Sequence, residues 1–249
     1  MTAPIPAEWS PHRAMWVGWP SHGDLWEDNL APAQAEVEAL VRALARPGRE
    51  QVKLLVGNDE ALADARARFE GVDGVTVIAG RFGDIWLRDT GPIFGAGSRT
   101  ANAFRFNGWG GKYDLPHDDE VADQIGEASG AALSLHDFVL EGGALDHDGA
   151  GTILTTRQCL LNPNRNPDWT AAAAETALAE ALGARRVVWL GDGLLNDHTD
   201  GHVDNLARFV APGVVACPVA WGRNDPNAEV YDATARDLHA AVDAEGRAL

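Results

Sequence analysis

The sequence predicts an α/β fold built from several small strand–helix–strand units. Segments with the apolar spacing of a helix alternate with short apolar runs typical of strands along most of the 249 residues. Some neighbouring strands are separated only by turn residues, which indicates hairpins between the units rather than strict alternation. The chain is 45% hydrophobic and 23% charged, which suits one domain with a sizeable core or two small domains.

Five segments have helical spacing and plausible ends. The first carries Val37, Leu40, Val41 and Leu44 on one face and stops before Pro47-Gly48. Asn58 or Asp59 is suited to cap the second, and Gly183 to end the Ala-rich fourth. The expected helices are residues 32–45, 59–69, 118–129, 168–182 and 228–242.

The strands are expected where short aliphatic or aromatic runs are bounded by Gly, Pro, Asn or Asp. A Gly-rich turn at 107–111 and an Asn/Pro loop at 162–167 separate several of them. The expected strands are residues 14–19, 51–56, 75–78, 100–106, 133–140, 152–156, 186–190, 203–210 and 214–216.

Composition limits the function classes. The formal net charge of −17 favours solubility or attraction of a cationic substrate, and it makes nucleic acid a poor partner. No apolar run is long enough to cross a membrane, and residues 1–10 do not form a secretory signal, so a cytoplasmic location is expected. Cys159 and Cys217 alone do not indicate a disulfide framework.

The segment 191–205 is the richest in ionisable groups. His198, Asp200, His202 and Asp204 stand at every second position, so in an extended chain they share one face. Such a face is typical of a site that handles protons, a cation or a metal. A zinc site on a helix would use His198 and His202, but Gly201 opposes a helix and Thr199 stands where zincins carry Glu. A hydrogen-bonded polar cluster is the other alternative.

Two shorter motifs also carry charged groups beside turns. Residues 83–92 place Asp84 and Asp89 around Trp86, and their simpler interpretation is an Arg88–Asp89 ion pair at a strand end. Residues 140–146 place Glu141 before paired glycines, which permit close backbone approach but also make an ordinary turn. The Trp-rich start at residues 9–20 reads mostly as core, although one Trp can line a cation pocket.

These motifs together resemble those of agmatine deiminases and the related Porphyromonas-type peptidyl-arginine deiminases. The resemblance covers nearly the whole chain in the same order, and it implies a pentein-type α/β propeller of ββαβ repeats. Besides the start of the chain, the segments that carry it are Asp84-Ile-Trp-Leu-Arg-Asp89-Thr-Gly-Pro92, Phe106-Asn-Gly-Trp-Gly-Gly-Lys-Tyr113, Leu140-Glu-Gly-Gly-Ala144, Thr155-Thr-Arg-Gln-Cys-Leu-Leu-Asn-Pro-Asn-Arg-Asn-Pro167 and His198-Thr-Asp-Gly-His-Val-Asp204.

The resemblance also implies roles for individual residues. Asp89 and Asp204 match the pair that grips a guanidinium by charge-assisted bonds, and His202 matches the general acid and base. Trp86 matches a residue of the agmatine cleft. Glu141 and Asp200 are expected either behind these residues or at the amine end of the substrate. The implied reaction converts agmatine and water to N-carbamoylputrescine and ammonia, for putrescine biosynthesis, without cofactor or metal.

One part of the family pattern is missing from the 249 residues. The nucleophilic cysteine of the family lies in a Gly-Gly-Gly-Asn-x-His-Cys stretch, which does not occur here, and Cys159 falls in what the family carries as a structural strand. We therefore expect an incomplete propeller: a single deiminase domain, residues 1–249, truncated at its C-terminal side and inactive alone, with apolar surface exposed.

Three alternatives stay open beside agmatine hydrolysis. One is deimination of peptidyl-arginine, and another is an inactive guanidinium-binding fragment. The third is a metal-dependent hydrolase that uses His198, Asp200, His202 and Asp204. The expected partner is a small cationic guanidino compound, without nucleic acid or membrane, and the protein is a possible homo-oligomer.

Overall fold

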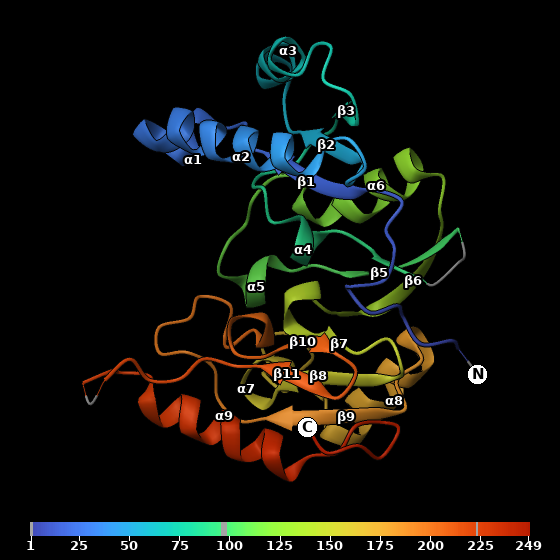
Figure 1. Ribbon diagram of the computed structural model, residues 1–249, viewed down its shortest axis with the longest axis vertical. Coiled ribbons are helices and arrows are strands. Elements are labelled where there is room, and N and C mark those ends of the chain that lie inside the picture. The colour runs from blue at the N-terminus through green and yellow to red at the C-terminus, as the bar shows by residue number, and fades with distance from the viewer. Residues whose placement is uncertain (1, 96–98, 223) are drawn as a thin grey trace. The chain divides into compact units, whose positions relative to one another are not determined.

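The computed structural model describes residues 2–95, 99–222 and 224–249 and has a mixed α/β fold (Figure 1). The chain divides into two compact units. The large unit comprises Met1–Ser10, Pro92–Tyr113 and Gly130–Leu249. The small unit comprises Pro11–Gly91 and Asp114–Ser129.

The small unit contains a three-stranded sheet, ordered β1 (Met15–Trp19), β2 (Val52–Val56) and β3 (Val75–Ala79), in which neighbouring strands are parallel. The crossovers run through α2 (Leu30–Leu44) and α3 (Asp59–Arg68), and the Asn58 side chain caps α3 by accepting from Ala61 N at 2.9 Å. Its core includes Trp19, Val41 and Leu54. The remaining elements are α1 (Gly23–Trp26), η1 (Glu27–Asn29), α4 (Leu87–Thr90), η2 (Asp118–Glu120) and α6 (Val121–Ser129).

The large unit contains two sheets with the same topology. One is ordered β4 (Ile93–Phe94), β5 (Thr100–Arg105), β6 (Ala132–Val139), and the other β7 (Asp146–His147), β8 (Thr152–Thr156), β9 (Arg186–Leu190). In each, the first pair of strands is antiparallel and the second pair parallel. This agreement confirms that the structural unit recurs in these two sheets.

The second of these sheets is joined and covered by helices. α8 (Ala171–Leu182) connects β8 to β9 and ends at Gly183, whose φ of 69° is left-handed. The antiparallel pair β10 (Arg208–Ala211) and β11 (Val214–Ala216) precedes α9 (Ala228–Ala240), which packs against β9 (Figure 1). The short helices of this unit are α5 (Gly108–Gly111), η3 (Gly142–Ala144), α7 (Arg157–Leu160) and η4 (Val203–Asn205).

The structure differs from the sequence interpretation at three places. Residues 191–202 are not extended, because Asn196, Asp200 and Gly201 have φ of 62°, 63° and 88°, and the expected strand at 203–210 is η4 followed by β10. The four ionisable residues therefore do not share one strand face. Cys159 lies on the short helix α7 rather than on a strand.

No helix of the described residues is both long enough and apolar enough to span a bilayer.

Candidate active site

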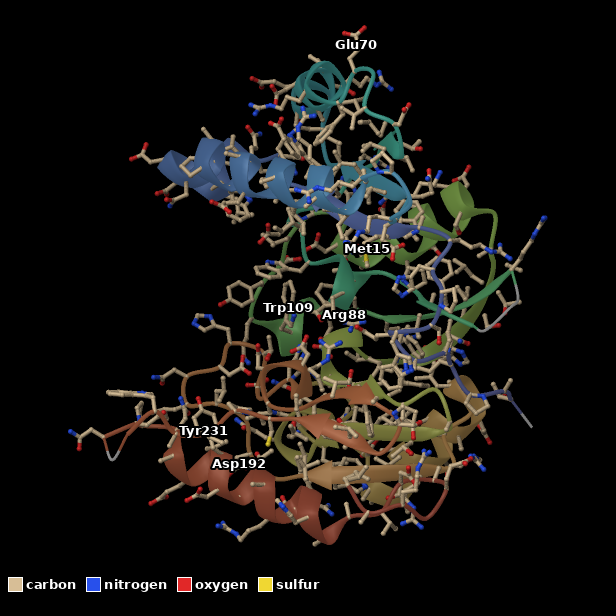
Figure 2. All side chains as sticks on the ribbon, viewed as in Figure 1. Met15, Glu70, Arg88, Trp109, Asp192 and Tyr231 are labelled. Carbon is tan, nitrogen blue, oxygen red and sulfur yellow. The ribbon has the colours of Figure 1, made fainter. Side chains whose placement is uncertain are left out.

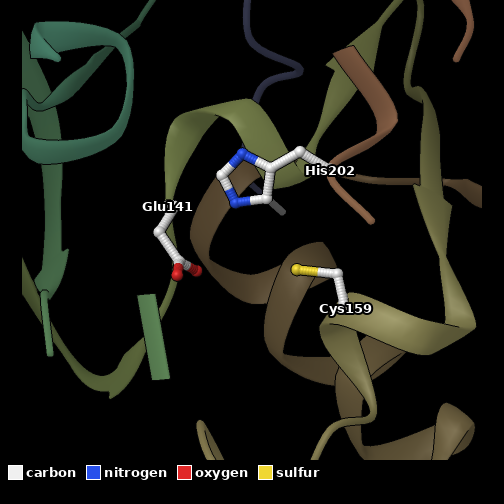
Figure 3. Close-up of side chains that lie close together, drawn as sticks. All are labelled: Glu141, Cys159 and His202. Carbon is white, nitrogen blue, oxygen red and sulfur yellow. The ribbon is translucent and has the colours of Figure 1, made fainter. Parts of the chain in front are cut away.

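Three buried side chains of the large unit lie together: Glu141, Cys159 and His202. Glu141 precedes η3, Cys159 lies on α7, and His202 precedes η4. One carboxylate oxygen, the thiol sulfur and one ring nitrogen all lie within 4.8 Å of one another. Figure 3 shows the carboxylate and the thiol on one side of the His202 ring. The cluster therefore encloses an imidazole, a carboxylate and a thiol.

Thr156 explains why His202 lies beside α7. Its hydroxyl caps α7 by accepting from Cys159 N at 3.1 Å, and it donates to the carbonyl of Gly201 at 2.6 Å. Gly201 in turn packs on Gly193, where an added Cβ would lie 2.0 Å from Gly201 Cα. One threonine and two glycines thus bring residues 193 and 201–202 against the helix.

Asn166 fixes the chain on the Glu141 side. Its amide group accepts from Val139 N at 3.0 Å and donates to Val139 O at 2.9 Å, at the end of β6. The strand therefore ends two residues before Glu141, and the Asn166 loop is held alongside. This arrangement brings Arg165 to Glu141.

Arg165 is the centre of a buried ion network. Its side chain is 0% exposed, and its Nε donates to the two carboxylate oxygens of Glu141 at 2.9 and 3.0 Å. Nη1 donates to Asp200 Oδ2 at 2.8 Å, and Nη2 donates to the carbonyl of Thr199 at 2.8 Å. Burial works to lower the pKa of Arg165, but the surrounding anionic groups outweigh it and raise that pKa.

Asp200 has cationic partners on two sides. Burial works to raise its pKa, but hydrogen bonds from Lys112, Asn164 and Arg165 outweigh burial and lower the pKa to about 2. Lys112 also donates to the carbonyl of His198 at 2.9 Å. Asp200 is therefore an ionised internal partner of these groups.

The Gly-rich segment at 107–113 reaches the same loop. Tyr113 hydrogen-bonds through its hydroxyl to Nδ1 of His198. Trp109, labelled in Figure 2, is buried in a left-handed conformation with φ 54° and packs edge-on against Phe106 and Tyr113. Lys112 and Tyr113 together hold residues 198–200 from the outside.

The cluster strongly perturbs two titratable groups. Burial, aided by the positive charge of Arg165, lowers the pKa of His202 to about 3, so its ring is neutral at pH 7. Burial raises the pKa of the Cys159 thiol well above its ordinary value. A neutral imidazole can accept a proton, whereas a buried thiol of raised pKa is a poor nucleophile.

Four of the expected site residues belong to this unit. Glu141 and His202 are in the cluster, and Asp204 has a carboxylate oxygen within 4.8 Å of a His202 ring nitrogen. Asp200 joins through Arg165. Sequence reasoning missed Arg165 as a site residue, although a lone arginine between two Asn-Pro pairs was a visible signal.

The other two expected residues, Trp86 and Asp89, belong to the small unit. Asp89 lies on α4, and Trp86 is 51% exposed just before it. Asp84 accepts from the Trp86 indole Nε1 at 2.7 Å and from Ile85 N at 2.8 Å. Buried Asp118 accepts from Gly83 N at 2.7 Å and from Asp84 N at 3.3 Å. The exposed indole is thus held by a carboxylate on an anchored turn.

In the part of the chain that the structure describes, the geometry does not bring His198, Asp200, His202 and Asp204 together as one set of metal ligands. His198 is bonded to Tyr113, and Asp200 to Lys112 and Arg165. Among the described residues, neither His198 nor Asp200 is in a group whose ligand atoms lie close enough to share an ion. Glu141, Cys159 and His202 are close enough, but both Glu141 oxygens already face the Arg165 guanidinium. A cation there would meet another cation.

Comparisons with known proteins identify the family. The profile of the Porphyromonas-type peptidyl-arginine deiminase family matches residues 4–249. Agmatine deiminase of Stutzerimonas stutzeri is 43% identical over 98% of this chain and 68% of the relative, and that of Ectopseudomonas mendocina is 40% identical with the same coverage.

Solved structures agree as well. The agmatine deiminase of Enterococcus faecalis superimposes with a TM-score of 0.92 and 34% identity, covering 99% of this chain and 68% of the other. A substrate-bound C315S agmatine deiminase of C. jejuni superimposes with a TM-score of 0.85 and 29% identity, covering 95% and 70%. The chain belongs to the Porphyromonas-type peptidyl-arginine deiminase family.

Proposed function

We propose that this chain belongs to an agmatine deiminase, which converts agmatine and water to N-carbamoylputrescine and ammonia, a step towards putrescine. The observation that carries the proposal is the buried neutral His202 with the Glu141 and Asp204 carboxylates beside it. The agmatine deiminases of S. stutzeri and E. faecalis support it through their similarity over nearly the whole chain.

The proposed binding groups suit a guanidinium, which keeps its charge in proteins and presents a planar set of N–H donors. Asp89 and Asp204 accept its N–H groups, and Trp86 offers an aromatic face to the alkyl part. Glu141 and Asp200 are proposed to act behind these residues, since both are bonded to Arg165. Carboxylates already engaged with an internal cation are less able to bind a second one.

His202 is proposed to move the protons. As a neutral base it takes the proton of the attacking thiol, whose sulfur bonds to the central guanidinium carbon. The imidazolium then gives this proton to the leaving nitrogen, which departs as ammonia. Water next loses a proton to His202, and its oxygen bonds to the same carbon. The carbon–sulfur bond then breaks, the imidazolium returns its proton to the departing sulfur to restore the thiol, and the hydroxyl proton of the product leaves to ammonia or solvent.

Neither cysteine of the 249 residues suits the role of that thiol. Cys159 is 0% exposed with a raised pKa, and Cys217 packs beside a hydrophobic core cluster at the end of the β10–β11 hairpin. We therefore propose that these residues bind the guanidinium but release no ammonia by themselves. Robust ammonia release from agmatine, abolished by Cys159→Ala or Cys217→Ala, would contradict this proposal.

Calorimetry with the 249-residue chain tests the binding function. Agmatine is expected to bind, whereas putrescine, which lacks the guanidinium, is expected to bind much more weakly. Asp204→Asn should remove most of the affinity, and Asp192→Asn, an exposed aspartate of the same segment, is the matched control. Equal affinity for agmatine and putrescine would overturn the guanidinium assignment.

The description of the matching family makes peptidyl-arginine the second candidate substrate. Competition between agmatine and an arginyl peptide separates the two, since a cleft built for the small amine should prefer agmatine. A preference for the peptide would favour the second candidate.

The finer architecture is also part of the proposal. We propose that residues 1–249 act as one deiminase domain with a pentein-type propeller arrangement, that the protein is cytoplasmic and binds no nucleic acid, and that it is a possible homo-oligomer. Coincident unfolding of the two units would support a single domain, and light scattering measures the oligomeric state.

A further inference from the structure

We propose that Arg165 is a positioning residue for His202: its guanidinium holds the Glu141 carboxylate against the imidazole and fastens the loop that leads into His202. The inference rests on the proposed function of the same site and adds a residue to it. Arg165 is enclosed, with 0% of its side chain exposed, so it acts on substrate only through its neighbours.

The first part of the argument is the Glu141 contact. Arg165 Nε lies 2.9 and 3.0 Å from the two Glu141 oxygens, and Nη2 lies 2.8 Å from Oε1. This planar set of bonds sets the orientation of the carboxylate, which a lysine ammonium would not do. Because Glu141 and His202 lie within 4.8 Å, orienting the carboxylate orients what the imidazole faces.

The second part is the loop contact. Arg165 Nη1 lies 2.8 Å from Asp200 Oδ2, and Nη2 lies 2.8 Å from the carbonyl of Thr199. Thr199 also holds the chain at His202 directly, since its hydroxyl accepts from His202 N at 3.1 Å. One guanidinium therefore sets both the carboxylate beside His202 and the backbone before it.

The third part is charge. Burial is the main cause of the lowered pKa of His202, and the positive charge of Arg165 adds to it by disfavouring a second positive charge on the ring. The charged and titratable groups of the large unit that face His202 are Lys112, Glu141, Cys159, Arg165, Asp197, Asp200 and Asp204.

The test compares Arg165→Met and Arg165→Lys with wild type in the 249-residue chain, with Arg157→Met as control. Arg157 is exposed on α7 and stacks over Trp189 instead of joining the network. Nitrogen-15 spectra of the histidine rings, assigned with His202→Asn, report the protonation and tautomer of His202. Calorimetry with agmatine reports binding.

In Arg165→Met, His202 is expected to take up its proton at a pH higher by about one unit or more. In Arg165→Lys, the positive charge remains but the planar set of guanidinium N–H donors is lost. The His202 ring signals should therefore shift, and agmatine should bind about tenfold more weakly. Arg157→Met should leave both readouts at wild-type values. An unchanged His202 titration and tautomer in a folded Arg165 variant would overturn the proposal.

Two features keep the test decisive. If Arg165→Met fails to fold, Arg165→Lys decides: wild-type His202 signals and wild-type agmatine affinity in that variant would overturn the proposal. If wild type binds no agmatine, the proposed substrate fails, yet the His202 spectra still show whether Arg165 controls the ring. Failure of the function and failure of the positioning role are thus seen separately.

Discussion

Asp200 in the large unit and Asp118 in the small unit are both largely enclosed acidic side chains, yet their pKa values move in opposite directions. Burial opposes the charge of each. At Asp200 the hydrogen bonds from Lys112, Asn164 and Arg165 outweigh burial and lower the pKa to about 2. At Asp118 burial outweighs the backbone N–H groups of Gly83 and Asp84 and raises the pKa. Asp118 is the more deeply buried of the two, has only backbone donors and lies near the acidic groups of Asp84 and Asp119, whereas Asp200 accepts from two cationic side chains.

The site of the large unit and the 83–90 turn of the small unit differ in the same way. The site of the large unit encloses its charges and balances them with an internal arginine. The 83–90 turn of the small unit keeps its aromatic group exposed and is held through backbone bonds to one acid. We expect the first region to fail by exposing unbalanced charge and the second by losing local order.

The largest effect should follow from unbalancing the network. Glu141→Gln leaves the buried Arg165 guanidinium without its main counter-charge, and we expect it to lower the free energy of unfolding by about 3–5 kcal/mol. Urea titration measures this loss. Glu180→Gln, an exposed glutamate of α8, should change stability little.

A double variant sharpens the same point. Glu141→Leu with Arg165→Met removes both charges and should recover a substantial part of the loss. If Glu141→Gln were as stable as wild type, the network would not be balancing a buried charge.

The second effect concerns acid. The folded pKa of His202 is about 3 against an ordinary 6.5, so the unfolded chain binds more protons between these values and stability falls as pH falls. From pH 7 to pH 5 wild type should lose about 2 kcal/mol more than His202→Asn. Denaturation at both pH values tests this, with His239→Asn on α9 as the control. Equal losses in wild type and His202→Asn would exclude a buried neutral His202.

A smaller effect is expected at Asp118. Asp118→Ala removes the acceptor of two backbone N–H groups and should cost about 1–3 kcal/mol, whereas exposed Asp119→Ala should cost little. Because the folded pKa of Asp118 is raised, its contribution is greatest at low pH, so the gap between wild type and Asp118→Ala should widen on acidification.

Asp200 should show the reverse pH trend. Its folded pKa is lowered, so its contribution is present above 3.8 and is lost as pH falls towards 2, which narrows the gap between wild type and Asp200→Ala. The same sign for Asp118 and Asp200 would break the comparison between the two regions.

The smallest effect is local to Trp86. Asp84→Ala removes the acceptor of the indole N–H and should leave stability nearly unchanged while the indole gains rapid motion. Nitrogen relaxation of the Trp86 indole should give an order parameter below about 0.6 in the variant. Trp86→Phe identifies the signal. A rigid indole in Asp84→Ala would show that Asp84 does not hold it.

The elements predicted well are those with a local physical cause. The Asn58 cap of α3 and the Gly183 end of α8 are confirmed, and so is the apolar face of α2 except at Leu40, which is 50% exposed. Residues 191–202 are not extended, because left-handed residues and the Thr156–Gly201 bond turn the chain there. Alternating charged residues carry no apolar face that would favour a strand.

The site was predictable in part, for a similar reason. Glu141 and His202 followed from motifs, and the structure places them together, while the substrate roles of Asp89, Asp204 and Trp86 stay predictions. Arg165 could not be placed, because its partners Glu141 and Asp200 are 24 and 35 residues away in the chain. Charge pairs across such distances leave no spacing pattern.

The discontinuous build of the large unit has a consequence for biosynthesis. Thr2 donates its hydroxyl to the carbonyl of Glu180, 178 residues later, and Glu8 pairs with Arg208. At about 5–20 residues per second, a ribosome needs roughly 9–36 s to make the partners of the first residues. The emerging chain must therefore keep its N-terminal segment undocked at least until Glu180 has been made, which leaves apolar Ile5 accessible to chaperones during that time.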